Sequence, residues 1–168
     1  MRYVMMRETG PGKNGIVPYF SVYREGGPLF CHVIGEKNPF TGKLALMSPQ
    51  GRELGRVLRV GTPMLSYHTI WEAERRRAVL IRNLAAPANP YRLYSAGWRF
   101  RGDCFSGSFD LVDGAGRVVM THGLCWKCGR EQACLEIAPG EDALCLCIAA
   151  VVDSTPRTPP APRAVGAN

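Results

Sequence analysis

The sequence predicts an all-β domain with one buried helix: a closed antiparallel barrel of about twelve strands around an apolar C-terminal α-helix. Two observations lead to this fold class. Residues 3–137 consist of short runs rich in Val, Ile, Leu, Tyr, Phe and Trp that Gly and Pro interrupt, which is typical of successive strands. Residues 143–152 are then apolar at every position, which is typical of a helix that is buried on all sides.

Size and composition favour one globular domain with a basic surface. The chain has 168 residues, 46% hydrophobic and 21% charged, which are ordinary values for a globular protein. Its net charge of +7 favours acidic partners such as phosphate-bearing surfaces. The first residues contain no long apolar run, so we predict no signal peptide, and no stretch is long enough to span a membrane. We therefore expect a cytoplasmic protein, which could attach peripherally to a membrane.

The first half of the chain predicts a series of hairpins. Turn-forming residues at 25–28 and 48–51 separate runs of strand-forming residues, and tight turns are also expected near Gly26, Gln50 and Glu74. The strands expected here are residues 1–7, 19–24, 29–34, 43–47, 53–60, 66–72 and 77–83.

The second half continues the pattern. Trp98 and Phe100 alternate with two arginines, which indicates a strand with one apolar face. Residues 113–116, Asp-Gly-Ala-Gly, form a strong hairpin signal. The unit of strand, turn and strand recurs at a spacing of roughly twenty to twenty-five residues, which suggests a meander. The strands expected here are residues 91–94, 98–102, 108–113, 117–121 and 132–137.

The apolar run at residues 143–152 is best explained as a helix. Glu141 and Asp142 precede it, and acidic residues suit the positive end of a helix dipole. A helix of about ten residues rises roughly 15 Å, which is about half of a membrane span. A buried strand is the alternative, because Cys, Ile and Val are also frequent in strands, but the length of the run favours a helix.

One arrangement accounts for both the large number of strands and the helix without a polar face. Large antiparallel sheets close or split, and a barrel wider than eight strands leaves a lumen. A helix about 10 to 12 Å across would fill that lumen and be buried by it. We therefore assign residues 1–153 to the barrel domain. Residues 154–168 contain four prolines and are expected to be a disordered tail.

Several of these residues resemble the LURP-one-related family, whose fold is shared with tubby C-terminal domains and phospholipid scramblases. The resemblance is firm over residues 98–152 and looser over residues 3–84, where Phe20, Val22 and Tyr23 fit. Asp103, Arg130 and Ala133 depart from the family pattern. The residues that carry the resemblance are Trp98, Gly102, the stretch from Phe109 through Asp113 to Arg117, Trp126, Leu135 and Ile137.

The resemblance implies a twelve-stranded barrel closed around its C-terminal helix, but it implies little chemistry. Tubby domains look like phosphoinositide binders that use basic side chains on the barrel. That basic site has no residue-by-residue match in this sequence, so it is not carried over. Fold-level analogy is in any case a weak warrant for function.

The seven cysteines and three histidines form no convincing catalytic or metal-binding set. Cys125 and Cys128 have redox or half-zinc-site spacing, but a second Cys-x-x-Cys pair is absent and the pair is expected between strands. Most cysteines are expected to be reduced and buried. His32, His68 and His122 fall in or beside strands, without an arguable nucleophile and acid. We predict no cofactor, no metal and no catalytic residue.

The run Arg75, Arg76 and Arg77 is the strongest candidate for a binding site. It lies in a predicted hairpin turn, where three guanidinium groups would project together and could bind phosphate oxygens. The alternative is a solvated turn with salt bridges to Glu72 and Glu74. Further arginines add to the positive field if their strands are neighbours: Arg82, Arg92, Arg99 and Arg101.

Three hypotheses about function follow. The first is a non-enzymatic binding module that docks on anionic phospholipid or phosphoinositide headgroups at a membrane surface. The second is a structural or adaptor barrel that binds another protein and carries an exposed apolar patch. The third, nucleic-acid binding through the same arginines, is the weakest, because no aromatic stacking platform accompanies them. An enzyme is not expected, because a barrel filled by its own helix leaves little room for a pocket.

Overall fold

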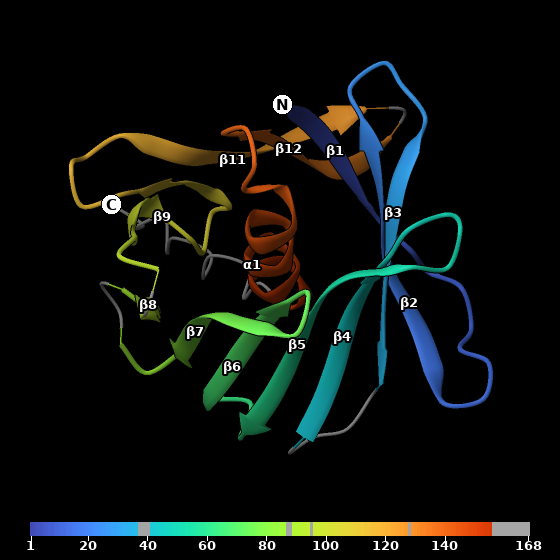
Figure 1. Cartoon of the computed structure of the whole chain (residues 1–168), viewed down its shortest axis with the longest axis horizontal. Helices are drawn as coiled ribbons and strands as arrows, with labels where there is room; N and C mark the ends of the chain where they lie inside the picture. Colours follow the sequence, from blue (N-terminus) through green and yellow to red (C-terminus); the bar gives the residue numbers. More distant parts are fainter. Residues whose placement is uncertain (37–40, 87–88, 95, 128, 156–168) are drawn as a thin grey trace, which may run out of the picture.

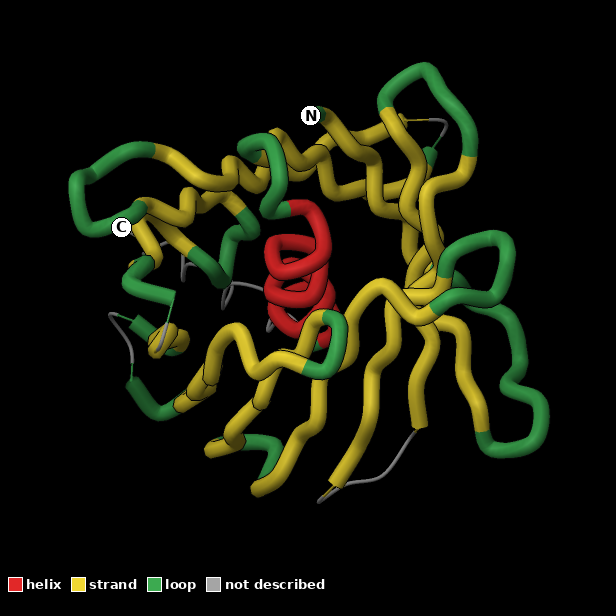
Figure 2. Tube along the Cα trace, viewed as in Figure 1, coloured by secondary structure: helices red, strands yellow, loops and turns green. Residues whose placement is uncertain are grey.

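Twelve antiparallel strands curve around a single helix in the computed structural model (Figures 1 and 2), which describes residues 1–36, 41–86, 89–94, 96–127 and 129–155. The predicted fold class is confirmed, and every predicted strand has a counterpart. The strands are β1 Arg2–Arg7, β2 Ile16–Arg24, β3 Leu29–Glu36, β4 Thr41–Met47, β5 Glu53–Gly61, β6 Leu65–Glu72, β7 Arg75–Asn83, β8 Tyr91–Tyr94, β9 Arg99–Asp103, β10 Ser108–Val112, β11 Val118–Lys127 and β12 Arg130–Ile137.

The strands form a meander whose first and last members pair with each other. The sheet order is β8-β7-β6-β5-β4-β3-β2-β1-β12-β11-β10-β9, and all the ladders are antiparallel. The edges of this sheet are β8 and β9, which no ladder joins within the described residues. The rings of Tyr91 on β8 and Phe100 on β9 meet across this gap, with centroids 5.8 Å apart. The barrel is therefore nearly closed.

Helix α1, Asp142–Ser154, lies inside the barrel (Figure 1), as the apolar run predicted. Its side chains are buried from Leu144 to Asp153, so the alternative of a buried strand is wrong. The wall is shaped to admit the helix: a Cβ at Gly55 of β5 would lie 3.2 Å from the Sγ of Cys147. The helix extends to Ser154, and Thr155 is buried as well. The packed domain therefore includes both residues, while residues 156–168 lie outside the described part.

The largest departure from the predicted strands is β11. It was expected to end near Thr121, but it continues to Lys127 and pairs with β12 along its length. Cys125 therefore lies within a strand and not in a connection between strands. No helix among the described residues is long and apolar enough to cross a membrane.

Candidate functional site

The predicted arginine run begins immediately after a tight turn between β6 and β7. Ala73 and Glu74 form this turn with positive φ values of 45° and 62°, the arrangement of a two-residue hairpin whose twist matches its strands. Glu72 and Arg75 are cross-strand partners directly beside the turn. The three arginines therefore sit together at one end of the barrel, on the first residues of β7.

Salt bridges neutralise the acidic side chains around this turn. The cations in these salt bridges are Arg77 and Arg56, and not Arg75 or Arg76. The guanidinium of Arg77 pairs with Glu72 and lies 3.1 Å from Glu141, which precedes the helix. Arg56 of β5 forms a bidentate contact with Glu74, with both N···O distances 2.8 Å, and lies 3.0 Å from Glu53. These hydrogen bonds lower the pKa of the Glu74 carboxyl. The predicted alternative of bridges to Glu72 and Glu74 is thus realised in part.

Arg75 and Arg76 remain as the excess cations of the turn. Both side chains are exposed, and neither forms an ion pair with a described residue. A shallow depression beside the turn is lined by all three arginines together with Glu72 and Ala73. This small surface, formed by Arg75 and Arg76, is called the arginine turn below.

The other arginines proposed for this site lie elsewhere. Arg99 and Arg101 are on β9, which β8 separates from β7, and Arg101 pairs with Asp110 at 2.6 Å. Arg82 is at the far end of β7 and is buried, with only 5% of its surface exposed. Its guanidinium binds Thr155 beyond the C-terminal end of the helix, whereas Arg77 binds Glu141 at the N-terminal end. The helix between them rises about 20 Å. The six predicted residues therefore do not form one cluster.

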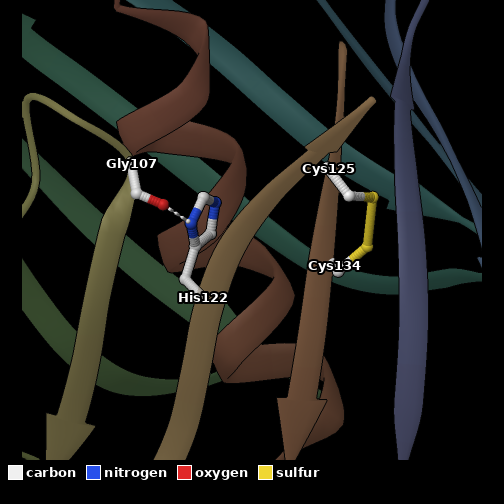
Figure 3. Close-up of a disulfide and its surroundings, with 4 residues drawn as sticks. All are labelled: Gly107, His122, Cys125 and Cys134. Atoms are coloured by element: carbon white, nitrogen blue, oxygen red, sulfur yellow. Dashed lines mark hydrogen bonds between the residues drawn. A yellow bond between two sulfur atoms is a disulfide. The ribbon is translucent and has the colours of Figure 1, made fainter. Parts of the chain in front are cut away.

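Cysteine pairing differs from the prediction. Cys125 of β11 is joined by a disulfide to Cys134 of β12 (Figure 3), so these two are exceptions to the expectation that most cysteines are reduced. Their strands are adjacent, and Cys134 pairs in register with Gly123, two residues from Cys125. Cys128, the other half of the expected motif, lies outside the described residues. Among the described residues no group of three or more His, Cys, Asp or Glu could hold a metal.

The remaining described cysteines behave as buried apolar residues. Cys31, Cys104, Cys145 and Cys147 are free and buried. Burial raises the pKa of the Cys31 and Cys104 thiols to about 12 and also raises the pKa of the two helix thiols. Since the thiolate is the nucleophilic form, these four residues are unsuited to nucleophilic or redox chemistry.

Two histidines lie beside serines, but without the geometry of a catalytic triad. The Oγ of Ser21 lies 3.1 Å from His32 Nδ1, yet it donates to Glu8 at 2.6 Å, so the acid orients the serine and not the histidine. Ser66 Oγ lies 2.9 Å from His68 Nε2, and both residues are buried. His122 faces Gly107 O on one side (Figure 3), and its Nε2 lies 2.9 Å from Asp153 on the other.

Comparisons with known proteins identify a similar fold but no family or function. No family model matches the chain, and no curated protein matches it. The chain is similar to an X-ray structure of a protein from Arabidopsis thaliana, with a TM-score of 0.57 and 11% sequence identity. The match covers 91% of this chain and 89% of that chain. At this identity the likeness shows a shared fold alone.

Proposed function

We propose that the chain is a non-enzymatic binding module that docks on anionic phospholipid headgroups at a membrane surface. The observation that carries the proposal is the arginine turn. Arg75 and Arg76 project from the end of the barrel without ion pairs among the described residues, while Arg77 and Arg56 already engage the nearby acids. Two adjacent guanidinium groups suit phosphate oxygens.

The expected attraction is modest and depends on salt. A basic residue near an anionic leaflet contributes about 1 kcal/mol, so the two free arginines supply about 2 kcal/mol. Such binding is peripheral and reversible. The proposal places the protein in the cytoplasm, facing the anionic inner leaflet, where such a charge-driven contact would form.

We also propose membership of the LURP-one-related family. The shared barrel and the motif residues Trp98, Gly102, Asp113 and Trp126 support it. Phosphoinositide binding, which the resemblance to tubby domains implies, agrees in chemistry with the arginine turn.

Vesicle co-sedimentation tests the membrane proposal. The full chain is mixed with vesicles of neutral phosphatidylcholine, or of phosphatidylcholine with phosphatidylserine or a phosphoinositide, at low and high salt. We expect binding only to the anionic vesicles, with loss at high salt. The variant Arg75→Glu with Arg76→Glu should abolish it.

A matched control keeps the net charge equal. Lys13→Glu with Arg130→Glu changes the charge by the same amount at two exposed positions away from the turn. This control should bind as the natural chain does. Equal loss in both variants would show that only the net charge matters, and absence of binding under all conditions would refute the proposal.

A second candidate function is protein binding by the outer face of β5 and β6. Val60 and Tyr67 are cross-strand partners with 63% and 49% of their surfaces exposed, and Met64 in the connecting turn is 54% exposed. A contiguous exposed apolar face of this kind supports a protein-interaction surface. The test compares proteins retained by the natural chain and by Val60→Lys with Tyr67→Lys. Retention of the same proteins by both would exclude this face.

A further inference from the structure

Arg82 is a buried cation with an unused hydrogen-bond donor. It alternates in phase with Ala78 and Leu80, so its side chain faces the barrel interior. Its Nη1 donates to the Oγ1 of Thr155 at 2.8 Å, but its buried Nε has no hydrogen-bond partner. No carboxylate among the described residues forms an ion pair with it. A buried guanidinium in this state is costly, and an additional acceptor would lower that cost.

The side chain of Arg82 lines a pocket of about 300 Å³ at the C-terminal end of the helix. Arg59, His68 and Thr155 line the same pocket, and Pro63 and Met64 lie at its boundary. This volume holds a phosphate group with several waters. The barrel, which the sequence predicts to be filled by the helix, therefore contains a space at this end, lined by apolar side chains together with the cationic and polar groups named above.

Strand register brings the cationic groups of the pocket together. On the inner face Arg59 of β5 pairs with His68 of β6, and Ser66 of β6 pairs with Arg82 of β7. The pKa of His68 is sensitive to the electrostatic potential of these arginines. Burial, and after it the charges of Arg82 and Arg59, lower its pKa to about 3. His68 is therefore neutral at pH 7 and surrounded by positive potential.

Among the described residues, acidic groups do not cancel this potential. Glu36 is the carboxylate among the residues that line the pocket, and it is exposed at the end of β3. Lys43 also lines the pocket, but its ammonium lies 3.3 Å from Glu53. The negative end of the helix dipole offsets part of the Arg82 charge and equals about half an elementary charge. The charges of Arg82 and Arg59 together exceed these offsets, so the described part of the pocket wall is net positive.

We infer that this pocket binds a phosphate group, with the guanidinium groups of Arg82 and Arg59 as donors to its oxygens. The inference goes beyond the proposed function, because the pocket and the arginine turn lie at opposite ends of the helix. The same chemistry is offered by free phosphate and by a phosphomonoester lipid headgroup. The two sources differ in the experiment that detects them.

The first arm titrates the full chain with inorganic phosphate at pH 7 and follows the His68 ring resonances by NMR. We expect a saturable shift and a rise in the pKa of His68, because a bound anion opposes the two arginine charges. Arg82→Met should weaken binding at least about tenfold. Arg59→Met should do the same while it leaves the Arg82–Thr155 bond intact, so the inference stays testable if Arg82→Met fails to fold.

The second arm uses vesicles that contain phosphatidic acid, whose headgroup is a phosphomonoester. Binding that Arg82→Met or Arg59→Met removes, and that Arg75→Glu with Arg76→Glu leaves, would assign the lipid headgroup to this pocket. The control Arg130→Gln, at an exposed position that lines neither this pocket nor the arginine turn, should affect neither arm. If the natural chain binds neither probe, or if folded Arg82→Met and Arg59→Met bind as it does, the inference is wrong.

Discussion

His122 Nε2 lies 2.9 Å from Asp153 Oδ2 in the interior of the barrel, and this contact ties the last turn of the helix to β11. The other ring nitrogen, Nδ1, lies 2.8 Å from the carbonyl oxygen of Gly107 (Figure 3). The Gly107 carbonyl oxygen accepts a hydrogen bond and the Asp153 carboxyl can accept one, so each ring nitrogen faces a hydrogen-bonding partner. Its ring stacks on Phe109, with centroids 4.5 Å apart. The apolar helix is therefore anchored by a buried polar contact.

Substitution at Asp153 should separate the roles of charge and hydrogen bonding. Asp153→Ala leaves the imidazole without its buried partner and should reduce the free energy of unfolding by about 3–5 kcal/mol. Asp153→Asn should cost less, because an amide N–H can donate to Nε2 of a neutral ring. Urea unfolding of the three proteins measures both effects. Equal losses in the two variants would show that the pair is not held in this way.

The contact between the helix and the wall predicts a second effect, at Gly55. A Cβ there would lie 3.2 Å from Cys147 Sγ and 3.3 Å from the carbonyl oxygen of Trp71, so helix and neighbouring strand oppose it from two sides. Gly55→Ala should therefore destabilise the protein by about 1–3 kcal/mol.

Gly123 of β11 provides the matched control for that substitution. A Cβ at this strand glycine meets nothing within 4 Å. Gly123→Ala should be neutral or slightly stabilising, because it removes freedom from the unfolded chain. Chemical denaturation of both variants gives the comparison. A Gly55→Ala protein as stable as Gly123→Ala would mean that the helix does not press on β5 at this point.

The buried thiols predict a pattern of chemical modification. At pH 8 Cys31, Cys104, Cys145 and Cys147 should resist iodoacetamide in the native protein and react after denaturation, because burial keeps them protonated and inaccessible. Mass spectrometry of digested samples identifies the modified positions. Rapid labelling of Cys145 or Cys147 in the native state would contradict the burial of the helix.

The barrel and its helix could be predicted because they depend on local patterns. Hairpin signals such as residues 113–116 specify a turn from the local sequence alone. A helix without a polar face must be buried on all sides, which in this fold places it inside the barrel. The length of β11 could not be predicted in the same way. Gly123 interrupts its pattern, and pairing with β12 carries the strand through it to Lys127.

The candidate site was harder to predict because it depends on which face each side chain occupies. The three arginines at 75–77 are adjacent in sequence, so their proximity needs no tertiary information. The inward position of Arg82 follows from strand alternation, because it lies in phase with Leu80 and Ala78, a pattern in which a charged residue is unexpected. Its proximity to Arg59 and His68 depends on the register of β5, β6 and β7, and no local pattern contains that register.

The disulfide illustrates the same limit. In the sequence, Cys125 and Cys128 have the Cys-x-x-Cys spacing, which is a familiar local signal. The structure joins Cys125 to Cys134 instead, across two strands of the barrel wall. Such a pair is recognisable only when the register of β11 and β12 is known, since Gly123 and not Cys125 is opposite Cys134.

His68 predicts how stability depends on pH. Its pKa is lowered to about 3 in the folded protein, chiefly by burial and then by Arg82 and Arg59, whereas an unfolded histidine titrates near 6.5. Between these values the unfolded chain binds a proton that the folded protein does not, so the free energy of unfolding falls as the pH falls below about 6.5. From pH 6.5 to 4.5 the loss should be about 2 kcal/mol. Urea unfolding over this range, repeated for His68→Asn and for the exposed His32→Asn, isolates the contribution. His68→Asn should flatten the dependence while His32→Asn should not, and equal slopes in all three proteins would show that His68 becomes protonated in the folded state.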